Sequence, residues 1–462
     1  MKKNNLLLAY YGDDFTGSTD ALEFLSRAGI RTVLFIQPPD PEQLERYPGL
    51  QAAGVAGNTR ALSPKQMESV LRPAFTALRQ LGAPHIHYKV CSTFDSSPTI
   101  GSIGKAIEVG AEVIPAPFVP LLVAAPALGR HCVFGNLFAR MGIGSDGAIY
   151  RLDRHPSMSR HPVTPADESD LRLHLSRQTP KKTALLDILQ IARPDAPGLL
   201  GKLVQDGAEV VLFDAMYEEQ MGAVGALIDG YATRETPLFS VGSSGVEMAL
   251  GAHWAANGQL QPPQEWGHPG HPGRAQGLLV VSGSCSPVTS GQIAWAVANG
   301  FAEVPVEINA HEEASGPGFA LECDVEKVVS LLQQGTGVVV HTSRGADDER
   351  IARTARIFEE QEMDTISTSL AYGSFLGNLV RDVAGRAPLT RIVVAGGDTS
   401  SYAARAMGIE AVEMIAPLAP GAPLCKAFAP GSPVNGLQVV FKGGQVGRED
   451  FFGMVAEGGN RQ

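Results

Sequence analysis

The sequence has little that would place the protein in an oxidising compartment or in a membrane. Its 462 residues include only five cysteines, which are scattered and form neither a CxxC pair nor a Cys/His spacing typical of zinc ligands. A disulfide framework and a structural zinc site are therefore not expected, and a reduced cytoplasm fits this cysteine usage. The apolar run at residues 6–11 is too short for a secretory signal, and no segment approaches the length that crosses a bilayer, so we expect a cytoplasmic protein.

An excess of positive charge is also missing. The chain carries 37 Lys and Arg against 48 Asp and Glu, which gives a formal net charge of −11. Such an acidic chain is a poor general binder of nucleic acid, so neither nucleic acid nor a membrane is an expected partner. The composition, 44% hydrophobic and 18% charged, is that of an ordinary globular protein and is far from that of a disordered chain.

The chain is too long for one ordinary hydrophobic core, so two domains, or three, are expected. The segment 258–276 is dense in Pro, Gly and polar residues, and a new pattern of strand, turn and helix starts directly after it. We therefore expect a first domain at residues 1–257, a linker at 258–276 and a second domain at 277–462. His268 and His271 in the linker could bind a metal, but no further ligand is evident and an extended connector is the favoured interpretation.

Short apolar runs alternate with helix-length segments in both parts of the chain. Strands that are separated by helices form mostly parallel sheets. The expected fold is therefore α/β with two domains, each a mostly parallel sheet flanked by helices, and with an interdomain cleft. The expected strands are residues 6–11, 32–36, 54–56, 85–90, 119–124, 183–186, 210–213, 238–241, 277–281, 337–342 and 391–395.

The first strand is followed by a turn that carries two adjacent carboxylates. The run LLLAYYGDDFTGSTDALEFLSRAG at residues 6–29 indicates an apolar strand, a polar turn with Asp13 and Asp14, and an amphipathic helix. Such turns form anion sites at the carboxyl ends of strands in α/β sheets. Helix capping explains one of the two acids. The second suits a general base, a Mg²⁺ ligand or an acceptor for a substrate hydroxyl, and a functional role is the favoured interpretation.

Two later strand ends add a cation and a hydroxyl-rich loop. Arg60, in NTRAL, is by default a surface cation, but beside the first turn its fork of N–H groups could hold a substrate carboxylate. Cys91 could be a nucleophile, although no paired histidine is evident and packing is favoured. The loop after the strand at 85–90 offers a cation, hydroxyls and an acid that suit a polyol, namely Lys89, Ser92, Thr93 and Asp95.

Three turns rich in glycine and serine occur in the second part, and two of them follow expected strands. Successive glycines leave backbone N–H groups free to form a nest for phosphate, so the three together indicate a nucleotide site. The chain has no GxxxxGK[ST] motif, which excludes a P-loop enzyme, and no full GxGxxG with an acid about twenty residues on, which disfavours a standard dinucleotide fold. The turns are VSGSCSP with Ser282, Gly283 and Ser284, AGGDTS with Gly396, Gly397, Asp398 and Thr399, and FKGGQVG with Lys442, Gly443 and Gly444.

Taken together, these residues resemble the four-carbon acid sugar kinase family, long catalogued as a domain of unknown function. The landmarks occur in the family's order from Leu6 to about Phe452, and they are GDDFTGSTD, NTR, KVCSTFDS, GSIGKAIE, HPVTP, GSCSPVTSGQ, AGGDTS and KGGQVG. The resemblance implies an N-terminal sugar-acid domain, a C-terminal nucleotide domain, and ATP-dependent phosphorylation of a terminal hydroxyl. A small acid sugar, ATP and Mg²⁺ are the implied ligands, and a homodimer is left open.

The resemblance also assigns residues to the two ligands. Asp14 would accept the proton of the substrate hydroxyl as the catalytic base, while Arg60 and Lys89 would hold the substrate carboxylate. Ligands for the metal are not assigned. The implied substrate site comprises Asp13, Asp14, Arg60, Lys89, Val90, Cys91 and Ser92, and the implied nucleotide site comprises Ser282, Ser284, Gly396, Gly397, Asp398, Thr399, Gly443 and Gly444.

One stretch of the chain bears on the substrate. CSTFDSSPTIG stands where family members that act on threonate-type substrates often have a DSTLRG-like stretch, so the chain resembles the branch that acts on 3-oxo acids. The candidate substrates are 3-oxo-tetronate, threonate, erythronate and the branched 3-oxo-isoapionate, with transfer to the C4 hydroxyl. Two alternatives stay open: an NAD(P)-dependent hydroxy-acid dehydrogenase, and a non-catalytic cytoplasmic sugar-acid sensor.

Overall fold

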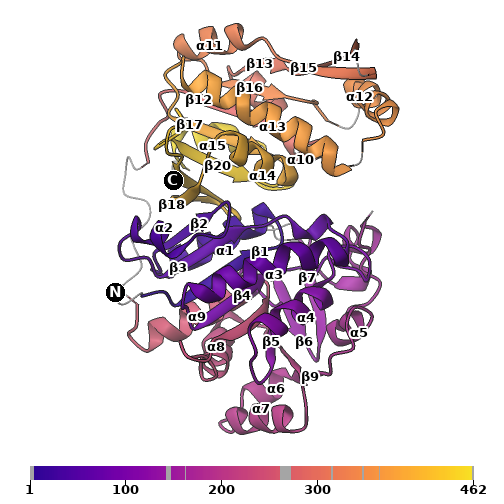
Figure 1. Ribbon diagram of the computed structural model, residues 1–462, viewed down its shortest axis with the longest axis vertical. Coiled ribbons are helices and arrows are strands. Elements are labelled where there is room, and N and C mark those ends of the chain that lie inside the picture. The colour runs from indigo at the N-terminus through magenta and orange to yellow at the C-terminus, as the bar shows by residue number, and fades with distance from the viewer. Residues whose placement is uncertain are drawn as a thin grey trace. The chain divides into compact units, whose positions relative to one another are not determined.

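The computed structural model describes residues 5–141, 147–161, 163–260, 272–313, 316–345, 348–363 and 365–459. The chain forms two compact units, Met1–Gln264 and Glu265–Gln462 (Figure 1). Residues 261–271 of the expected linker lie outside the described residues, and the expected domain limits and interdomain cleft stay predictions. The two-domain α/β fold class is confirmed, and each unit is described by itself below.

The first unit is built on a parallel sheet whose strands run through its core. Its strands are β1 (Leu8–Gly12), β2 (Thr32–Phe35), β3 (Ala52–Ala56), β4 (His85–Lys89), β5 (Val119–Leu122), β9 (Thr183–Leu186), β10 (Val210–Phe213) and β11 (Leu238–Gly242). They lie in the order β2-β3-β1-β4-β11-β5-β10-β9, and neighbouring strands run parallel to each other. Most of these strands are buried along their whole length, as expected for a parallel sheet that helices cover on both faces.

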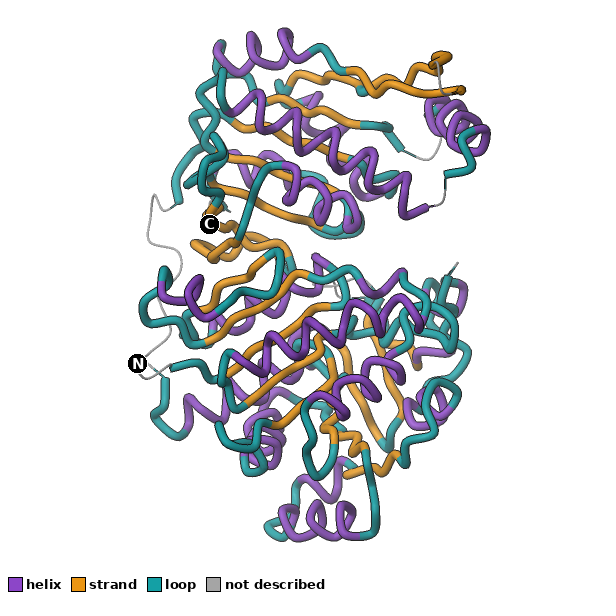
Figure 2. Tube along the Cα trace, viewed as in Figure 1, coloured by secondary structure: helices purple, strands orange, loops and turns teal. Residues whose placement is uncertain are grey.

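Helices cover both faces of this sheet. They are α1 (Phe15–Arg27), α2 (Pro41–Glu45), α3 (Pro64–Gln80), α4 (Ile103–Val113), α5 (Leu171–Ser176), α6 (Ile188–Ile191), α7 (Ala196–Gln205), α8 (Met221–Asp229) and α9 (Gly245–Ala256). The chain crosses from β1 to β2 in one direction and from β3 to β4 in the other, so right-handed connections put α1 and α3 on opposite faces. Accordingly α1 packs with α9, and α3 packs with α4 (Figures 1 and 2).

A small antiparallel sheet was not expected from the sequence. It consists of β6 (Arg130–Val133), β7 (Asn136–Arg140) and β8 (Ile149–Arg151). The turn between β6 and β7 holds Phe134 and Gly135 at positive φ, 50° and 80°. The buried carboxylate of Asp214 fixes this turn by accepting hydrogen bonds from the Phe134 and Gly135 amides at 2.6 and 3.0 Å. The hairpin therefore depends on a residue about eighty positions away, which local patterns do not reveal.

The second unit is also built on one mainly parallel sheet. Its strands are β12 (Leu278–Ser282), β13 (Ala302–Pro305), β16 (Val338–His341), β17 (Arg391–Ala395), β18 (Ala411–Ala419), β19 (Ala422–Phe428) and β20 (Gln438–Lys442), and β14 (Glu307–Glu313) pairs separately with β15 (Gly316–Glu322). The order is β13-β16-β12-β17-β20-β19-β18. The first five strands in this order are parallel, whereas β19 and β18 continue the sheet in antiparallel fashion.

Two layers of helices flank the second sheet as well. The helices are α10 (Pro287–Ala298), α11 (Val325–Gln333), α12 (Glu349–Glu360), α13 (Thr365–Ala384), α14 (Gly397–Ala406) and α15 (Phe451–Glu457). Helix α10 packs with α15, while α13 packs with α14 and α11 (Figure 1). Apolar residues of β12, β16, β17 and β20 form one core with α10 and α15.

In both units the first strand lies where the connections change direction along the sheet. β1 lies between β3 and β4, and β12 lies between β16 and β17. The strand ends are level, since Gly12 pairs with both Ala56 and Lys89, and Ser282 pairs with Ala395. Ligands of open α/β sheets bind outside the carboxyl ends of the strands at such switch points. The topology therefore directs attention to two edges, one in each unit.

Candidate functional site

The switch-point edge of the first unit brings together residues from three strand ends. Asp13 and Asp14 follow β1, Arg60 lies in the turn after β3, and Lys89 is the last residue of β4. Backbone hydrogen bonds tie these ends together, since the Asp13 amide donates to the Lys89 carbonyl at 2.8 Å and the Arg60 amide donates to the Asp13 carbonyl at 3.0 Å. The residues that the sequence singled out thus share one edge although they lie up to 76 positions apart.

Asp13, Asp14 and Arg60 form an ion-pair cluster. The Arg60 guanidinium donates from Nε to Asp13 Oδ2 at 3.1 Å and from Nη2 to Asp13 Oδ1 at 2.9 Å, and its Nη1 lies 2.8 Å from Asp14 Oδ2. All three nitrogens therefore face carboxylates of this chain. Arg60 is neither a free surface cation nor an open clamp, and a substrate anion would have to share it with both aspartates.

Burial and charge act in opposite directions within this cluster. Burial raises the pKa of Asp13 above its usual value, an effect that the Arg60 charge opposes and the Asp14 charge reinforces. Burial also opposes the charge of Arg60, but Asp13 and Asp14 outweigh it and hold the pKa of Arg60 well above its usual value. With both aspartates ionised, the cluster carries one net negative charge, which suits the acceptance of a proton from a hydroxyl.

Asp14 is the more accessible of the two carboxylates and is held at both oxygens. Its side chain is 21% exposed, against 4% for Asp13. Oδ1 accepts a hydrogen bond from the Gly17 amide at 2.6 Å and caps α1, while Oδ2 faces Arg60. A Cβ on Gly17 would lie 2.6 Å from Asp14 Oδ1, so glycine is needed there. Asp14 therefore caps α1 and is at the same time placed to serve in the site.

Lys89 lies beneath this cluster and is almost fully buried. Its Nζ donates to the Val90 carbonyl at 3.1 Å and lies 3.5 Å from Asp20 Oδ2, while Asp20 also accepts a hydrogen bond from the Ser244 hydroxyl. Burial opposes its charge, but Asp20, Glu247 and Asp13 outweigh the burial and raise the pKa of Lys89. Lys89 therefore stays an ammonium inside the protein, and it is placed to balance the acidic edge from below.

The loop after β4 contributes Val90, Cys91 and Ser92. Val90 is buried and its amide donates to the Gly242 carbonyl at 2.7 Å, which joins the loop to β11. The Cys91 thiol lies 2.9 Å from the Thr93 hydroxyl, and burial raises the pKa of Cys91 to about 11. A thiol with so high a pKa is a poor nucleophile at neutral pH, which supports the packing interpretation. Ser92 is mostly buried beside it.

A buried acid and a histidine, neither of which was expected from the sequence, lie behind the same edge. Glu247 lies in the first turn of α9 and is fully buried, and its Oε1 lies 3.6 Å from His87 Nε2. Among the described residues, neither Glu247 oxygen nor His87 Nε2 has a hydrogen-bond partner. Burial raises the pKa of Glu247 to about 8, and burial together with Lys89 lowers the pKa of His87 to about 3. The signal was the run VGSSGVE, which repeats the strand, glycine turn and helix pattern of the first motif.

The switch-point edge of the second unit is made by the three glycine turns, residues 283–286, 396–399 and 443–444. The Gly283 amide donates to the Ala395 carbonyl at 3.0 Å, and the Gly396 amide donates to the Lys442 carbonyl at 2.9 Å. A Cβ on Gly283 would lie 2.3 Å from Thr399 Oγ1, and a Cβ on Gly444 would lie 2.7 Å from Ser284 Oγ. The turns therefore interlock through contacts that only glycine permits.

Two helices begin at these turns. Helix α10 follows Ser286, whose hydroxyl accepts a hydrogen bond from the Val288 amide at 3.2 Å, and α14 starts at Gly397 without a side-chain cap. Free amides at helix N-termini and in glycine turns attract phosphate. The edge gathers the backbone positions expected for the nucleotide, namely Ser282, Ser284, Gly396, Gly397, Thr399, Gly443 and Gly444, whereas the side chain of Asp398 lies outside the described residues.

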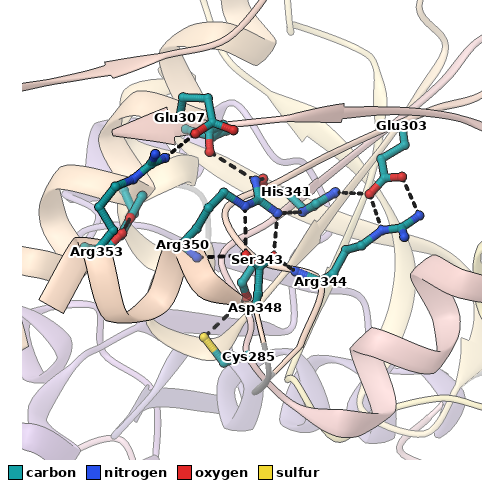
Figure 3. A network of polar contacts seen from close by, with 12 residues as sticks. Cys285, Glu303, Glu307, His341, Ser343, Arg344, Asp348, Arg350 and Arg353 are labelled. Carbon is teal, nitrogen blue, oxygen red and sulfur yellow. Dashed lines mark hydrogen bonds and ion pairs between the residues drawn. The ribbon is translucent and has the colours of Figure 1, made fainter. Parts of the chain in front are cut away.

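A charged network flanks this edge and was also missed (Figure 3). Glu303 accepts a bidentate pair of hydrogen bonds from Arg344, and Glu303 Oε1 lies 2.6 Å from His341 Nε2. On the other side of His341, Nδ1 lies 3.0 Å from Arg350 Nη2, and Arg350 pairs with Asp348 at 2.7 Å. The network holds the turn after β16 beside the first glycine turn, and the signal for it was the run HTSRG after an apolar strand.

Metal ligands do not gather in the described part of the chain. Among those residues, no group of three or more His, Cys, Asp or Glu side chains is arranged to hold a metal ion.

None of the described helices combines the length and the apolar character that a membrane span needs.

Two family models match the chain. A sugar-binding N-terminal domain matches residues 8–250, and a nucleotide-binding C-terminal domain matches residues 279–452. The ion-pair cluster of Asp13, Asp14 and Arg60 lies within the first match, and the three glycine turns lie within the second.

Proteins of known name match almost the whole chain. The 3-oxo-isoapionate kinase of Paraburkholderia graminis is 43% identical, over 98% of this chain and 94% of that protein. The 3-oxo-tetronate kinase of Pseudomonas savastanoi pv. phaseolicola is 28% identical, over 98% of this chain and 97% of that protein. Among solved structures, a protein of Salmonella typhimurium LT2 matches with a TM-score of 0.72 at 23% identity, over 97% of this chain and 98% of that one, and this likeness shows the fold.

Proposed function

The chain belongs to the four-carbon acid sugar kinase family, and we propose that it transfers the terminal phosphoryl group of ATP to the C4 hydroxyl of a small acid sugar. The first candidate substrate is 3-oxo-isoapionate, because the relative of that name is 43% identical to this chain. The candidates 3-oxo-tetronate, threonate and erythronate come next. The kinase relatives favour this function over the dehydrogenase and the sensor considered from the sequence.

The observation that carries the proposal is the oriented carboxylate of Asp14 at the switch point of the first sheet. Asp14 is partly exposed, and both of its oxygens are held, by the Gly17 amide and by Arg60. A general base must be fixed in direction and must be reachable by the hydroxyl that it deprotonates. We assign Asp14 this role and assign Asp13, which is buried and doubly bonded to Arg60, to holding the guanidinium in place.

Substrate orientation follows from the charges around Asp14. Arg60 retains N–H groups that its aspartates do not use, and these can donate to the substrate carboxylate or its oxo group. Lys89 is buried at 2% side-chain exposure, so it contributes a long-range positive charge rather than a direct contact. Cys91 and Ser92 would contact the hydroxyls of the substrate.

The glycine turns of the second unit are assigned to the ATP phosphates. Backbone amides at residues 397–399 and 443–444, together with the N-termini of α10 and α14, would neutralise phosphate charge, whereas the Gly283 and Gly396 amides already donate to the Ala395 and Lys442 carbonyls. Mg²⁺ bound with ATP supplies charge neutralisation at the β- and γ-phosphates. The donor set fits a cation held mainly by the phosphates, because the described residues offer no dedicated carboxylate cluster there.

The reaction itself requires little covalent chemistry from the protein. The C4 oxygen forms a bond to the γ-phosphorus, the bond from that phosphorus to the bridging oxygen breaks, ADP leaves, and Asp14 takes the hydroxyl proton. Such transfers depend on positioning and on charge stabilisation. The sugar site and the nucleotide site must therefore act together during turnover.

The test is a coupled assay of ADP release with each of the four acid sugars. We expect ADP release that depends on one of them, with 3-oxo-isoapionate the best, and ³¹P NMR should place the phosphate on the terminal carbon. ADP release with none of the four would contradict the proposal. A change in nicotinamide absorbance with NAD(P) would instead support the dehydrogenase, and binding of an acid sugar without turnover would support the sensor.

A further inference from the structure

Lys442 is a buried cation that the proposed mechanism does not use. It is the last residue of β20, directly before the glycines at 443–444, and it is fully buried. Its Nζ donates to Thr289 Oγ1 at 3.1 Å and lies 5.8 Å from the centre of the Phe451 ring. Among the described residues, the amine thus contacts one hydroxyl and one aromatic face.

No described carboxylate neutralises this lysine. No ion pair to Lys442 occurs within 4 Å among the described residues, in contrast to Lys89, which has Asp20. Lys442 pairs with Ala395 of β17 and contacts Thr289 of α10 and Phe451 of α15, and none of these three residues is charged. Burial alone lowers the pKa of Lys442 to about 7.

Helix α14 also packs against β20 and carries charge at both ends. Arg405 lies in its last turn, and the side chain of Asp398 in its first turn lies outside the described residues. Burial is the cause of the lowered pKa of Lys442, and Arg405 does not contribute to it. A buried charge without a partner is costly, so an anion that binds nearby would favour the protonated lysine.

Thr289 places Lys442 directly behind a glycine turn. The hydroxyl that accepts from Lys442 donates in turn to the Gly444 carbonyl at 2.8 Å. Gly444 itself is packed so closely on Ser284 that an added Cβ would lie 2.7 Å from its hydroxyl. A phosphate on the amides of these turns would therefore place negative charge close to a desolvated amine, where attraction is stronger than in water.

We infer that Lys442 is the buried counter-charge of the nucleotide phosphates, and that nucleotide binding at the glycine turns is coupled to the uptake of a proton by this lysine. The inference rests on the proposed function, because it needs the nucleotide at these turns. Lys442 acts as a positioning residue through the backbone of residues 443–444 and makes no contact with the reacting atoms.

The proton is the quantity to measure. At pH 8 a lysine with a pKa near 7 is about nine-tenths neutral in the free protein, whereas ADP is already fully ionised. ADP is titrated into the full-length protein by calorimetry at pH 8, in buffers of different ionisation enthalpy. The slope of the observed heat against that enthalpy counts protons, and we expect an uptake of about half a proton or more per ADP.

Two variants assign the proton to Lys442. Lys442→Met should bind ADP more weakly and take up no proton, and Lys442→Arg should bind ADP without uptake because arginine is charged throughout. Thermal unfolding of each variant checks its fold. ADP binding to the native protein without uptake, or an unchanged uptake in either folded variant, would overturn the inference alone. Absence of ADP binding to the native protein would overturn the proposed function together with it.

Discussion

The two switch-point edges occupy equivalent positions in their sheets but are built from different chemistry. The edge of the first unit carries charged side chains, since Arg60 lies within 3.1 Å of carboxylate oxygens of both Asp13 and Asp14, and Lys89 lies close enough to be influenced by Asp13. The edge of the second unit is lined by glycine turns whose amides are its main polar groups. An acid sugar has few groups at fixed places and needs directed side chains, whereas a polyphosphate is satisfied by many amides.

The comparison extends to the group buried behind each edge. Behind the first lies Glu247, an acid whose pKa burial raises to about 8, and behind the second lies Lys442, a base whose pKa burial lowers to about 7. Near pH 7 the buried Glu247 is therefore largely neutral, and the buried Lys442 is about half neutral. We therefore expect the first edge to be sensitive to substitutions that change charge, and the second edge to be sensitive to substitutions that add side-chain volume.

The largest effect is expected at Asp14. Asp14→Asn keeps the shape but removes the base, so kcat with the best acid sugar should fall on the order of 10²-fold or more. Steady-state ADP release measures this, with Asp167→Asn as the control because Asp167 is an exposed partner of Arg177. Turnover within a few-fold of the native value in Asp14→Asn would remove Asp14 from this role.

The next effect is on stability, at Arg60. Arg60→Met leaves the buried carboxylate of Asp13 without its counter-charge, which should lower the free energy of unfolding by about 3 kcal/mol. The double variant Asp13→Asn with Arg60→Met should recover part of this loss. Urea denaturation measures both, with Arg72→Met as the control because Arg72 pairs with exposed acids on the surface. Equal losses of unfolding free energy in Arg60→Met and Arg72→Met would show that Arg60 does not neutralise a buried carboxylate.

A steric effect is expected at Gly396. Its φ of 125° suits only glycine, and a Cβ there would lie 2.8 Å from Thr399 Oγ1. Gly396→Ala should weaken ADP binding about tenfold or more while the affinity for the acid sugar stays the same. Gly335→Ala is the matched control, because Gly335 also has positive φ, at 79°, but nothing lies within 4 Å of an added Cβ. Equal ADP affinities in the two variants would argue against a phosphate site at this turn.

The smallest effect is a pH dependence of stability that comes from Glu247. Because the folded-state pKa of about 8 exceeds the usual 4.5, the contribution of Glu247 is fully present below about pH 4.5 and is lost as the pH rises towards 8. Glu247→Gln should remove this loss and make the protein about 1 kcal/mol or more stabler than the native form at pH 8. Unfolding curves at pH 5 and pH 8 measure it, with Glu112→Gln as an exposed control. The raised pKa of Glu247 would be contradicted if the free energy of unfolding of the native protein did not fall between pH 5 and pH 8 relative to that of Glu247→Gln.

Much of both edges could be predicted from the sequence, because a local pattern of residues indicates each of them. An apolar run, a turn with glycine and a helix start mark β1 with α1, β12 with α10, and β17 with α14. The strands at 183–186, 210–213 and 391–395 have the expected bounds, and the others differ by a few residues. These features follow from burial and turn chemistry within about twenty residues.

What could not be predicted depends on distant parts of the chain. The antiparallel strands β18 and β19 join the sheet through pairing with β20, and the β6–β7 turn depends on Asp214. Arg60 could be assigned to the first edge, but its pairing with two carboxylates of this chain became visible only in the structure. Lys89 looked accessible in a polar stretch, yet Asp20 and Glu247 from two helices allow its burial. Whether a charged side chain is buried depends on the residues that pair with it, and those partners can lie far away in the sequence.

The central claim is that the first edge binds the acid sugar and the second binds the nucleotide, and a crossed calorimetric titration tests it most directly. Arg60→Lys and Gly396→Ala are each titrated with 3-oxo-isoapionate and with ADP. The account predicts that Arg60→Lys loses about tenfold or more in affinity for the acid sugar alone, and that Gly396→Ala loses a similar factor for ADP alone. Weaker binding of the same ligand in both variants, or unchanged binding of both ligands in both variants, would contradict this claim.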